Sequence, residues 1–433
     1  MHERPMTHER TDATTAERRT RAVSTVAIAA SGAVMVVLVA HDGSAGWQVL
    51  RALVVAGVTV VALVAAGSAR RLPARLAGVV EVGLGLVVFS TGVGIAVPHL
   101  SKLGADPIGI VGSIGVLAGL SLLIVGGVDL LRSTPIWVRV LTIPALVVVT
   151  VLALWTIGQA VAATNVPATS VDDDRRTELT DEQAVEDVEL TTSDAVRLSG
   201  WYVPSSNGAA VALLHGAGST RTGVLRHARL LAQHGYGVLV FDARGHGDSG
   251  GRAMDFGWYG DEDAEAAVSF LSAQPDVDAG RIALVGLSMG GEEAIGAAAA
   301  DERVQAVVAD GATNRRAADK AWLDEQHGWR GRIQQAIDAA MYGVTDALTE
   351  ADPPTPLADA VVAAAPRPVL LIAAGAMPDE VASNEWLRSR APTSVEVWVA
   401  PDSGHIGAQR AHPEEYERRV IDFLDRALAA PPA

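Results

Sequence analysis

Hydrophobic positions are distributed very unevenly along the 433 residues of the chain. Five segments before residue 163 are almost continuously apolar, whereas the remainder alternates short apolar runs with amphipathic stretches. A helix rises about 1.5 Å per residue, so about 20 apolar residues cross a hydrocarbon layer about 30 Å thick. We therefore predict five transmembrane helices, at 22–40, 49–68, 76–98, 107–128 and 140–162.

Basic residues near the ends of these segments predict the orientation of the helices. Ten lie in the N-terminal tail 1–21 and in the second and fourth loops, namely Arg4, Arg10, Arg18, Arg19, Arg21, Arg70, Arg71, Arg75, Arg132 and Arg139. Two, Arg51 and Lys102, lie on the opposite side. The positive-inside rule then places the N-terminus in the cytoplasm. After five crossings of the plasma membrane, everything beyond residue 163 is expected on the extracytoplasmic side.

Few polar groups interrupt the predicted spans. Glu81 is the only ionisable residue at any depth, and its place near the cytoplasmic end lets it pair with Arg75. The Gly115-x-x-x-Gly119 spacing permits a close contact between helices and favours bundle packing over a ligand site. A transporter normally has more intramembrane polar residues, so a transport function is disfavoured.

Acidic residues accumulate after the last predicted span. The chain has a net charge of −16 and no cysteine, which excludes disulfides and thiolate chemistry. Clustered Lys and Arg are absent from the acidic half, so nucleic acid is not expected as a partner. Apolar periodicity fails between 163 and 190, where acidic residues are frequent. A solvated linker is predicted there.

Strand-like and helix-like segments alternate beyond this linker. Strands are predicted at 196–204, 209–214, 237–242, 281–286, 304–310, 368–374 and 394–400, and helices at 222–234, 261–273, 290–300, 380–390 and 413–429. This alternation is typical of an α/β fold, in which helices cover both faces of a mostly parallel sheet. Chemistry then gathers at the carboxyl ends of the strands. The long connection at 312–360 predicts a small helical lid.

A candidate nucleophile lies between a predicted strand and a predicted helix. The sequence Gly286-Leu-Ser288-Met-Gly290 has the strand-to-helix context of a nucleophile elbow, where tiny flanking residues let strand and helix approach. A second Gly-x-Ser-x-Gly match, centred on Ser249, falls in a loop and is interpreted as structural. Ser288 is therefore the predicted nucleophile.

Two further motifs have the order that a serine nucleophile requires. His405 follows the last predicted strand and precedes the closing helix, which is the position of the general base. His215-Gly-Ala217-Gly ends an earlier strand and offers backbone N–H groups. We predict that the N–H groups of Ala217 and Met289 form an oxyanion hole.

Residues 191–430 resemble the α/β-hydrolase superfamily, in particular its serine aminopeptidase and monoacylglycerol-lipase-like branch. The matching motifs are His-Gly-Ala-Gly at 215–218, Asp-Ala-Arg-Gly-His-Gly-Asp-Ser at 242–249, Gly-Leu-Ser-Met-Gly-Gly at 286–291 and Ser-Gly-His at 403–405. This resemblance implies a membrane-anchored hydrolase that cleaves a small-molecule or lipid ester or amide through an acyl-enzyme, with no metal or organic cofactor. The alternative is a catalytically inactive domain that binds or senses.

Three residues are candidates for the acid that orients His405. The family usually has an apolar run, His-Gly, and an aspartate about three residues later, whereas this chain has Gly375-Ala-Met-Pro-Asp379-Glu380. Asp379 is the favoured acid. Glu380 is longer and one residue further on, and Asp310 ends the strand before the lid, an alternative location of the acid in the superfamily.

Overall fold

The computed structural model describes residues 73–180 and 184–429, together with isolated positions before residue 61. The chain divides into two compact units. The first comprises residues 1–167 with 343–350, and the second comprises 168–342 with 351–433. The predicted spans 22–40 and 49–68 lie almost entirely outside the described residues.

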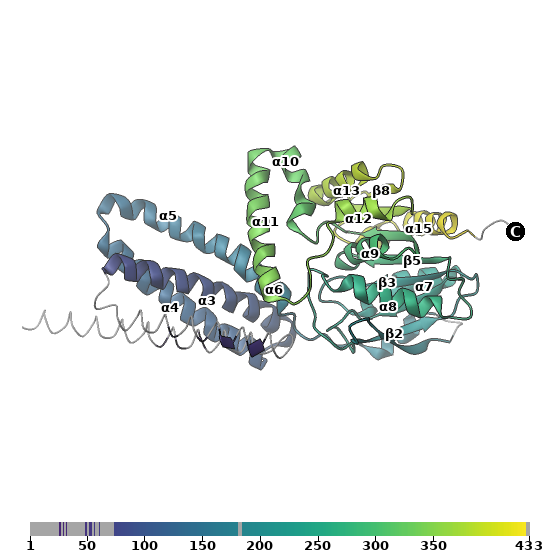
Figure 1. Cartoon of the computed structure of the whole chain (residues 1–433), viewed down its shortest axis with the longest axis horizontal. Helices are drawn as coiled ribbons and strands as arrows, with labels where there is room; N and C mark the ends of the chain where they lie inside the picture. The colour runs from purple at the N-terminus through teal and green to yellow at the C-terminus, as the bar shows by residue number, and fades with distance from the viewer. Residues whose placement is uncertain are drawn as a thin grey trace, which may run out of the picture. The chain divides into compact units, whose positions relative to one another are not determined.

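The helices and strands follow the predicted order closely (Figure 1). Helical elements up to the first strand are α3 Ala74–Leu103, α4 Pro107–Ser133, α5 Ile136–Ala153, the π-helical turn η1 Leu154–Gly158, α6 Gln159–Thr164 and the 3₁₀ turn η2 Asp173–Glu178. The strands are β1 Glu186–Thr191, β2 Arg197–Val203, β3 Ala210–Leu214, β4 Gly237–Phe241, β5 Ile282–Leu287, β6 Val304–Asp310, β7 Val369–Ala374 and β8 Val395–Ala400. The remaining helical elements are η3 Arg221–Val224, α7 Leu225–Gln233, α8 Gly260–Ser272, α9 Met289–Ala300, η4 Ala317–Lys320, α10 Trp322–His327, α11 Trp329–Leu348, α12 Leu357–Ala364, α13 Pro378–Arg390, α14 Ala408–Ala411 and α15 Pro413–Ala427.

Three helices of the first unit are long and apolar enough to cross a membrane. They are Arg75–Leu103, Pro107–Ser133 and Ile136–Thr164, the last running continuously through α5, η1 and α6. Each contains one of the last three predicted spans. The prediction of five is thus matched by three candidate spans within the described residues, which supports an association with a membrane.

Helices α3 and α4 pack against each other through glycines spaced seven residues apart. Three glycines of α3 each face one glycine of α4, and the order is antiparallel: Gly78 faces Gly126, Gly85 faces Gly119, and Gly92 faces Gly112. In each pair, a Cβ atom added to the α3 glycine would lie between 2.8 and 3.0 Å from the carbonyl oxygen of the paired glycine. The helices therefore touch backbone to backbone, as the small-residue spacing in the second of them predicted.

The second unit is built on one eight-stranded sheet with the order β1-β2-β4-β3-β5-β6-β7-β8. Only β2 runs against its neighbours, because β1 and β4 both pair with it antiparallel and every other pair is parallel. The central strands β3, β4 and β5 are buried along their whole length. The predicted mostly parallel sheet is thereby confirmed, and it explains why these strands are uninterrupted apolar runs.

Helices cover both faces of this sheet. One face packs against α8, α9, α12 and α13, and the other packs against α7 and α15. The carboxyl ends of the parallel strands point to one edge, where the loops after β3, β5, β6, β7 and β8 begin. Any side chains placed on these loops are brought together, which is the usual location of a site in a parallel sheet.

Within the segment predicted as a solvated linker, 163–190, residues 168–180 and 184–190 belong to the second unit and make specific contacts within it. Strand β1 lies within it and pairs with β2. Leu179 is fully buried, and the Thr169 hydroxyl accepts a hydrogen bond from the N–H of Gly247 at 2.8 Å. Asp173 forms an ion pair with Arg221 at 3.3 Å. The acidic residues misled the prediction because they occupy exposed positions beside a few anchoring contacts.

Candidate active site

Ser288 occupies a strained turn between β5 and α9. Its backbone has φ 54° and ψ −120°, a conformation that non-glycine residues rarely adopt. A Cβ at Gly286 would lie 2.1 Å from the carbonyl oxygen of Gly290, and one at Gly290 would lie 2.3 Å from that of Leu214. Gly286 therefore allows the end of β5 to approach the start of α9, and Gly290 allows the start of α9 to approach the end of β3. The geometry is that of a nucleophile elbow.

Three side chains form a hydrogen-bonded chain at this elbow. The Ser288 hydroxyl and His405 Nε2 are 2.8 Å apart, and His405 Nδ1 is 2.8 Å from Glu380 Oε2. The other carboxylate oxygen of Glu380 accepts the N–H of Ala374 at 2.7 Å. The hydrogen bond that His405 Nδ1 donates to the Glu380 carboxylate raises the pKa of His405. Since a carboxylate on Nδ1 holds the proton there, Nε2 is left free to accept the serine proton.

The structure brings Glu380 to His405, whereas Asp379 points away. Asp379 is exposed in the first turn of α13, and Glu380 is buried. The buried residues of this helix are Glu380, Ser383, Asn384 and Leu387. Positions 380 and 387 are seven residues apart, so they share a helix face. The packing of α13, which buries Leu387 on the same face as Glu380, decides between the two carboxylates, whereas family spacing pointed to Asp379.

Asp310 also lies at the site, but within the described residues it makes no side-chain hydrogen bond with His405. It is the last residue of β6, opposite Leu287 of β5. Its backbone carbonyl accepts the N–H of Ser288 at 2.7 Å. Burial raises the pKa of the Asp310 carboxyl to about 7, and the nearby charge of Glu380 acts in the same direction. Asp310 is therefore beside the catalytic chain without belonging to it.

The predicted oxyanion donors lie near Ser288. Met289 is the first residue of α9, where an N–H has no acceptor within the helix. Gly216, directly before Ala217, approaches the nucleophile so closely that a Cβ on it would lie 3.4 Å from the Cβ of Ser288. Within 73–180 and 184–429, neither the N–H of Ala217 nor that of Met289 has a protein acceptor. Both N–H groups are therefore available to a substrate oxygen.

Two other residues from the sequence motifs have structural roles. His215 is buried, its Nε2 accepts the N–H of Ala243 at 3.0 Å, and its Nδ1 is 2.9 Å from the carbonyl oxygen of Gly216. Burial lowers the pKa of His215 to about 3, so the ring is neutral and Nδ1 donates. The Ser249 hydroxyl donates to the carbonyl oxygen of Asp242 at 2.6 Å. Ser249 is thus a loop residue, as predicted from its context.

Glu292 is a site-proximal residue that the sequence patterns did not indicate. It lies one turn after Ser288 in α9, where its Oε1 accepts the N–H groups of Thr313 and Asn314 at 3.0 and 2.9 Å. Burial raises its pKa to about 7, although these hydrogen bonds oppose the shift. The Asn314 amide in turn donates to the Tyr342 hydroxyl at 2.7 Å. Glu292 therefore fixes the loop that leads from β6 into the lid.

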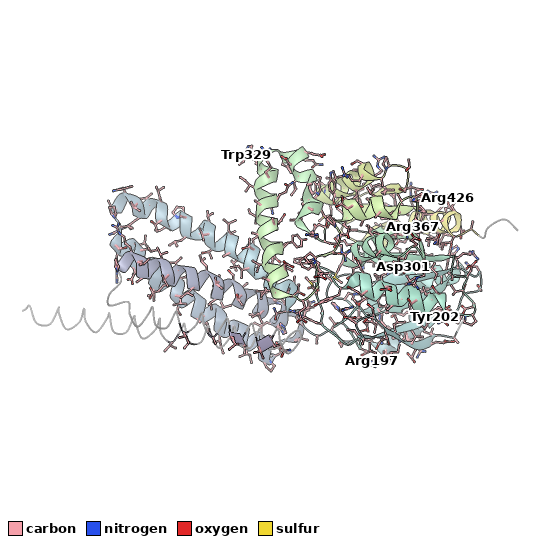
Figure 2. All side chains as sticks on the ribbon, viewed as in Figure 1. Arg197, Tyr202, Asp301, Trp329, Arg367 and Arg426 are labelled. Carbon is pink, nitrogen blue, oxygen red and sulfur yellow. The ribbon has the colours of Figure 1, made fainter. Side chains whose placement is uncertain are left out.

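The predicted lid, 312–360, is helical and its aromatic residues fall into two groups. Trp322 and Tyr342 are buried, and Tyr342 packs against Phe256 with ring centroids 5.1 Å apart. Trp329 and Ile333 are exposed on α11, and Figure 2 labels Trp329 at the start of that helix. Trp322 and Tyr342 are therefore packing residues of the lid.

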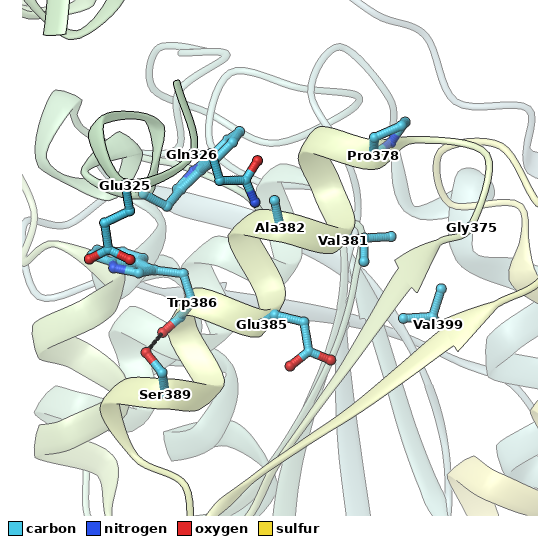
Figure 3. Close-up of a pocket in the computed structure, with 11 residues that line it drawn as sticks. Glu325, Gln326, Gly375, Pro378, Val381, Ala382, Glu385, Trp386, Ser389 and Val399 are labelled. Atoms are coloured by element: carbon cyan, nitrogen blue, oxygen red, sulfur yellow. Dashed lines mark hydrogen bonds between the residues drawn. The ribbon is translucent and has the colours of Figure 1, made fainter. Parts of the chain in front are cut away.

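A groove of about 710 Å³ lies between α10 and α13 (Figure 3). Its walls include Trp322 and Gln326 from α10 and Val381 and Trp386 from α13. Ser288 and His405 do not line it. The groove therefore lies beside the helix that carries Glu380 and is separate from the catalytic chain.

Residues 205–349 match the family model described as Hydrolase_4, serine aminopeptidase, S33. An uncharacterized protein of Mycobacterium tuberculosis strain H37Rv is 43% identical over 115 residues, which are 26% of this chain and 40% of that protein. The thiohydrolase aneE of Aspergillus aculeatus is 36% identical over 132 residues, which are 30% of this chain and 42% of that protein. The chain matches less than half the length of either relative.

Among solved structures, the Pyrococcus furiosus esterase Pf2001 is similar to this chain. The two are 27% identical, with a TM-score of 0.49, and the match covers 61% of this chain and 98% of the esterase.

The second unit is an α/β-hydrolase domain, as its strand order and its elbow define. Within that class, residues 205–349 are similar to the serine aminopeptidase family, which the sequence motifs also resemble. The chain combines this hydrolase domain with an N-terminal region of apolar helices.

Proposed function

We propose that this chain is a membrane-anchored serine hydrolase that cleaves an acyl ester or amide through an acyl-enzyme on Ser288. The observation that carries the proposal is the pair of 2.8 Å contacts that join Ser288, His405 and Glu380 at a strand-to-helix turn. A nucleophile, a base and an orienting acid in this geometry are the minimal machinery for acyl transfer.

The reaction then proceeds in two acyl transfers. Ser288 Oγ attacks the carbonyl carbon of the substrate while its proton passes to His405 Nε2, and the N–H groups of Ala217 and Met289 receive the developing oxyanion. His405 returns that proton to the leaving oxygen or nitrogen, and the acyl group remains on Ser288. Water next attacks the acyl-enzyme, gives a proton to His405, and releases the acid as Ser288 is reprotonated. Glu380 stays ionised and stabilises the imidazolium in both halves.

A fluorophosphonate probe tests this assignment directly. The probe is expected to label the full-length chain in detergent on Ser288 alone, because among the residues that the structure describes this is the serine that has a histidine 2.8 Å away at an elbow. Ser288→Ala should lose the label completely. Ser249→Ala is the matched control and should label normally, since its hydroxyl is bonded to a carbonyl oxygen. An unlabelled wild type would favour the alternative of an inactive binding or sensing domain.

The proposal includes a location for the hydrolase domain outside the cytoplasm, which the count of basic residues supports. Protease added to intact cells is expected to cut the exposed stretch near Asp172 and Asp174 and to leave the N-terminal tail inside. A tag at the N-terminus should therefore survive, whereas a tag at the C-terminus should be separated from the membrane fraction. Cleavage that requires lysis would reverse the orientation.

A further inference from the structure

Asp310 is a buried acid next to the catalytic chain that the mechanism above leaves unused. It ends β6 between Leu287 of β5 and Ile372 of β7, and only 1% of its surface is exposed. Its carbonyl oxygen accepts the N–H of Ser288. The backbone carbonyl of Asp310 therefore helps to hold Ser288 in place, whereas the side-chain carboxyl group takes no part in this hydrogen bond.

That carboxyl group is placed in an apolar layer. Side chains alternate along a strand, so Asp310 shares a face with Val308, which packs in the core beneath α7 and α15. Its Oδ2 is buried, and among the residues that the structure describes it has no hydrogen-bond partner. Tyr416 of α15 lies close enough for the charge of Asp310 to add to the effect of burial in raising the pKa of the phenol. A carboxylate in such surroundings is costly unless it is protonated or compensated by a neighbouring charge.

The charged groups that face Asp310 are those of the catalytic chain. Glu380 reaches it from α13 and disfavours its ionisation, whereas His405, from the loop after β8, favours it. The imidazole is adjacent, since a Cβ on Gly311 would lie 2.8 Å from His405 Cε1. Tyr416, from α15, is buried and its pKa is raised well above the usual value, so it stays neutral. Asp310 and Glu380 thus share a single cationic neighbour.

We propose that Asp310 is a positioning residue, whose buried carboxyl group beside His405 sets the basicity of that histidine through its own protonation. This inference rests on the serine hydrolase function proposed above. With Asp310 neutral, the negative charges that act on His405 are Glu380, which is hydrogen-bonded to it, and, with a smaller effect, Glu292 of α9. With Asp310 ionised, a further negative charge stabilises the imidazolium that forms as Ser288 loses its proton.

The charge of Asp310 has opposite effects on activity and on stability. An ionised Asp310 raises the pKa of His405, so it moves the rising limb of the pH–rate profile to higher pH and raises the plateau. Stability changes in the other direction, because the folded-state pKa of Asp310 is raised to about 7 from 3.8. The folded state then holds a proton that the unfolded state releases, and stability falls as pH rises between these values.

The test compares Asp310→Asn with the wild type as full-length proteins in detergent, using hydrolysis of a p-nitrophenyl ester. We expect the midpoint of the rising limb of kcat/KM to move to lower pH by roughly one unit and the plateau to fall by up to about tenfold. The difference in thermal midpoint, variant minus wild type, should increase as the pH rises from 5 to 8. Asp310→Ser should move the limb in the same direction, since charge and not size is responsible.

The outcomes separate this inference from the function on which it rests. Unchanged pH midpoints in both variants, with activity merely reduced, would assign Asp310 a purely structural role and end the proposal. A loss of activity in Asp310→Asn as large as that in Glu380→Gln would instead make Asp310 the triad acid and also overturn it. Activity that survives in Ser288→Ala would refute the serine hydrolase function itself, whatever the Asp310 variants do.

Discussion

Alanine at Ser288 or at His405 is expected to lower kcat for an activated ester by about a million-fold, with KM nearly unchanged. Either change removes the proton transfer from Ser288 Oγ to His405 Nε2, the two atoms that lie 2.8 Å apart. Because the two side chains act as one unit, the double variant should lose hardly more than each single variant. Pre-steady-state and steady-state hydrolysis of a p-nitrophenyl ester measures all three.

The double variant is the decisive member of this set. Losses that multiply would mean that Ser288 and His405 act independently, which the hydrogen bond between them contradicts. Circular dichroism provides the control for folding, since Ser288→Ala removes one hydroxyl from a turn that its neighbouring glycines maintain. Alanine, like serine, has a Cβ atom, so the steric cost of the positive φ at residue 288 is the same in the variant.

Glu380→Gln is expected to lower turnover by about ten-thousand-fold with the fold intact. Glutamine keeps the size of the side chain but has one oxygen, and the N–H of Ala374 already uses one of the two carboxylate oxygens. If that bond persists, the amide NH₂ faces His405 Nδ1 and requires a lone pair there. The ring proton then moves to Nε2, and the imidazole cannot accept the proton of Ser288.

Asp379→Asn is the matched control for this change. Asp379 precedes Glu380 in the same helical turn, carries the same charge and is exposed, so its amide should leave turnover within about twofold, as expected for a surface change far from the reacting atoms. The pH–rate profile adds a second measurement. Glu380 raises the pKa of His405, and any residual activity of Glu380→Gln should therefore begin at lower pH. A collapse of activity in Asp379→Asn alone would contradict the geometry described above.

Much of the second unit could be predicted from the sequence, because its signals are local. Each predicted strand from 196–204 to 394–400 overlaps a strand of the structure to within one residue at its carboxyl end, since continuous apolar runs in a parallel sheet have no competing pattern. The elbow was also predictable, because a serine between two glycines, directly after an apolar strand and before a helix, is a pattern confined to a few residues. The mostly parallel sheet followed from the alternation of strands and helices.

The remaining features depend on contacts that are distant in the sequence. The pairing of β1 with β2 gives order to a segment whose composition predicted a linker, and composition does not report on an edge strand with exposed charges. The choice between Asp379 and Glu380 depends on which face of α13 turns inward, and this is decided by packing at Leu387. Glu292 was missed because a buried glutamate in an Ala-rich helix has no signature without the loop that it binds.

The backbone contact between α3 and α4 constrains six positions of these apolar helices that hydropathy alone does not distinguish. Lipid-facing positions tolerate any apolar residue, so hydropathy alone relates unrelated membrane proteins to one another. The glycines at 78, 85 and 92, and those at 112, 119 and 126, are fixed by steric exclusion, because a methyl group at these positions would meet backbone atoms. Two successive apolar segments with glycine at every seventh residue are therefore the pattern that a second chain needs in order to form the same close helical hairpin.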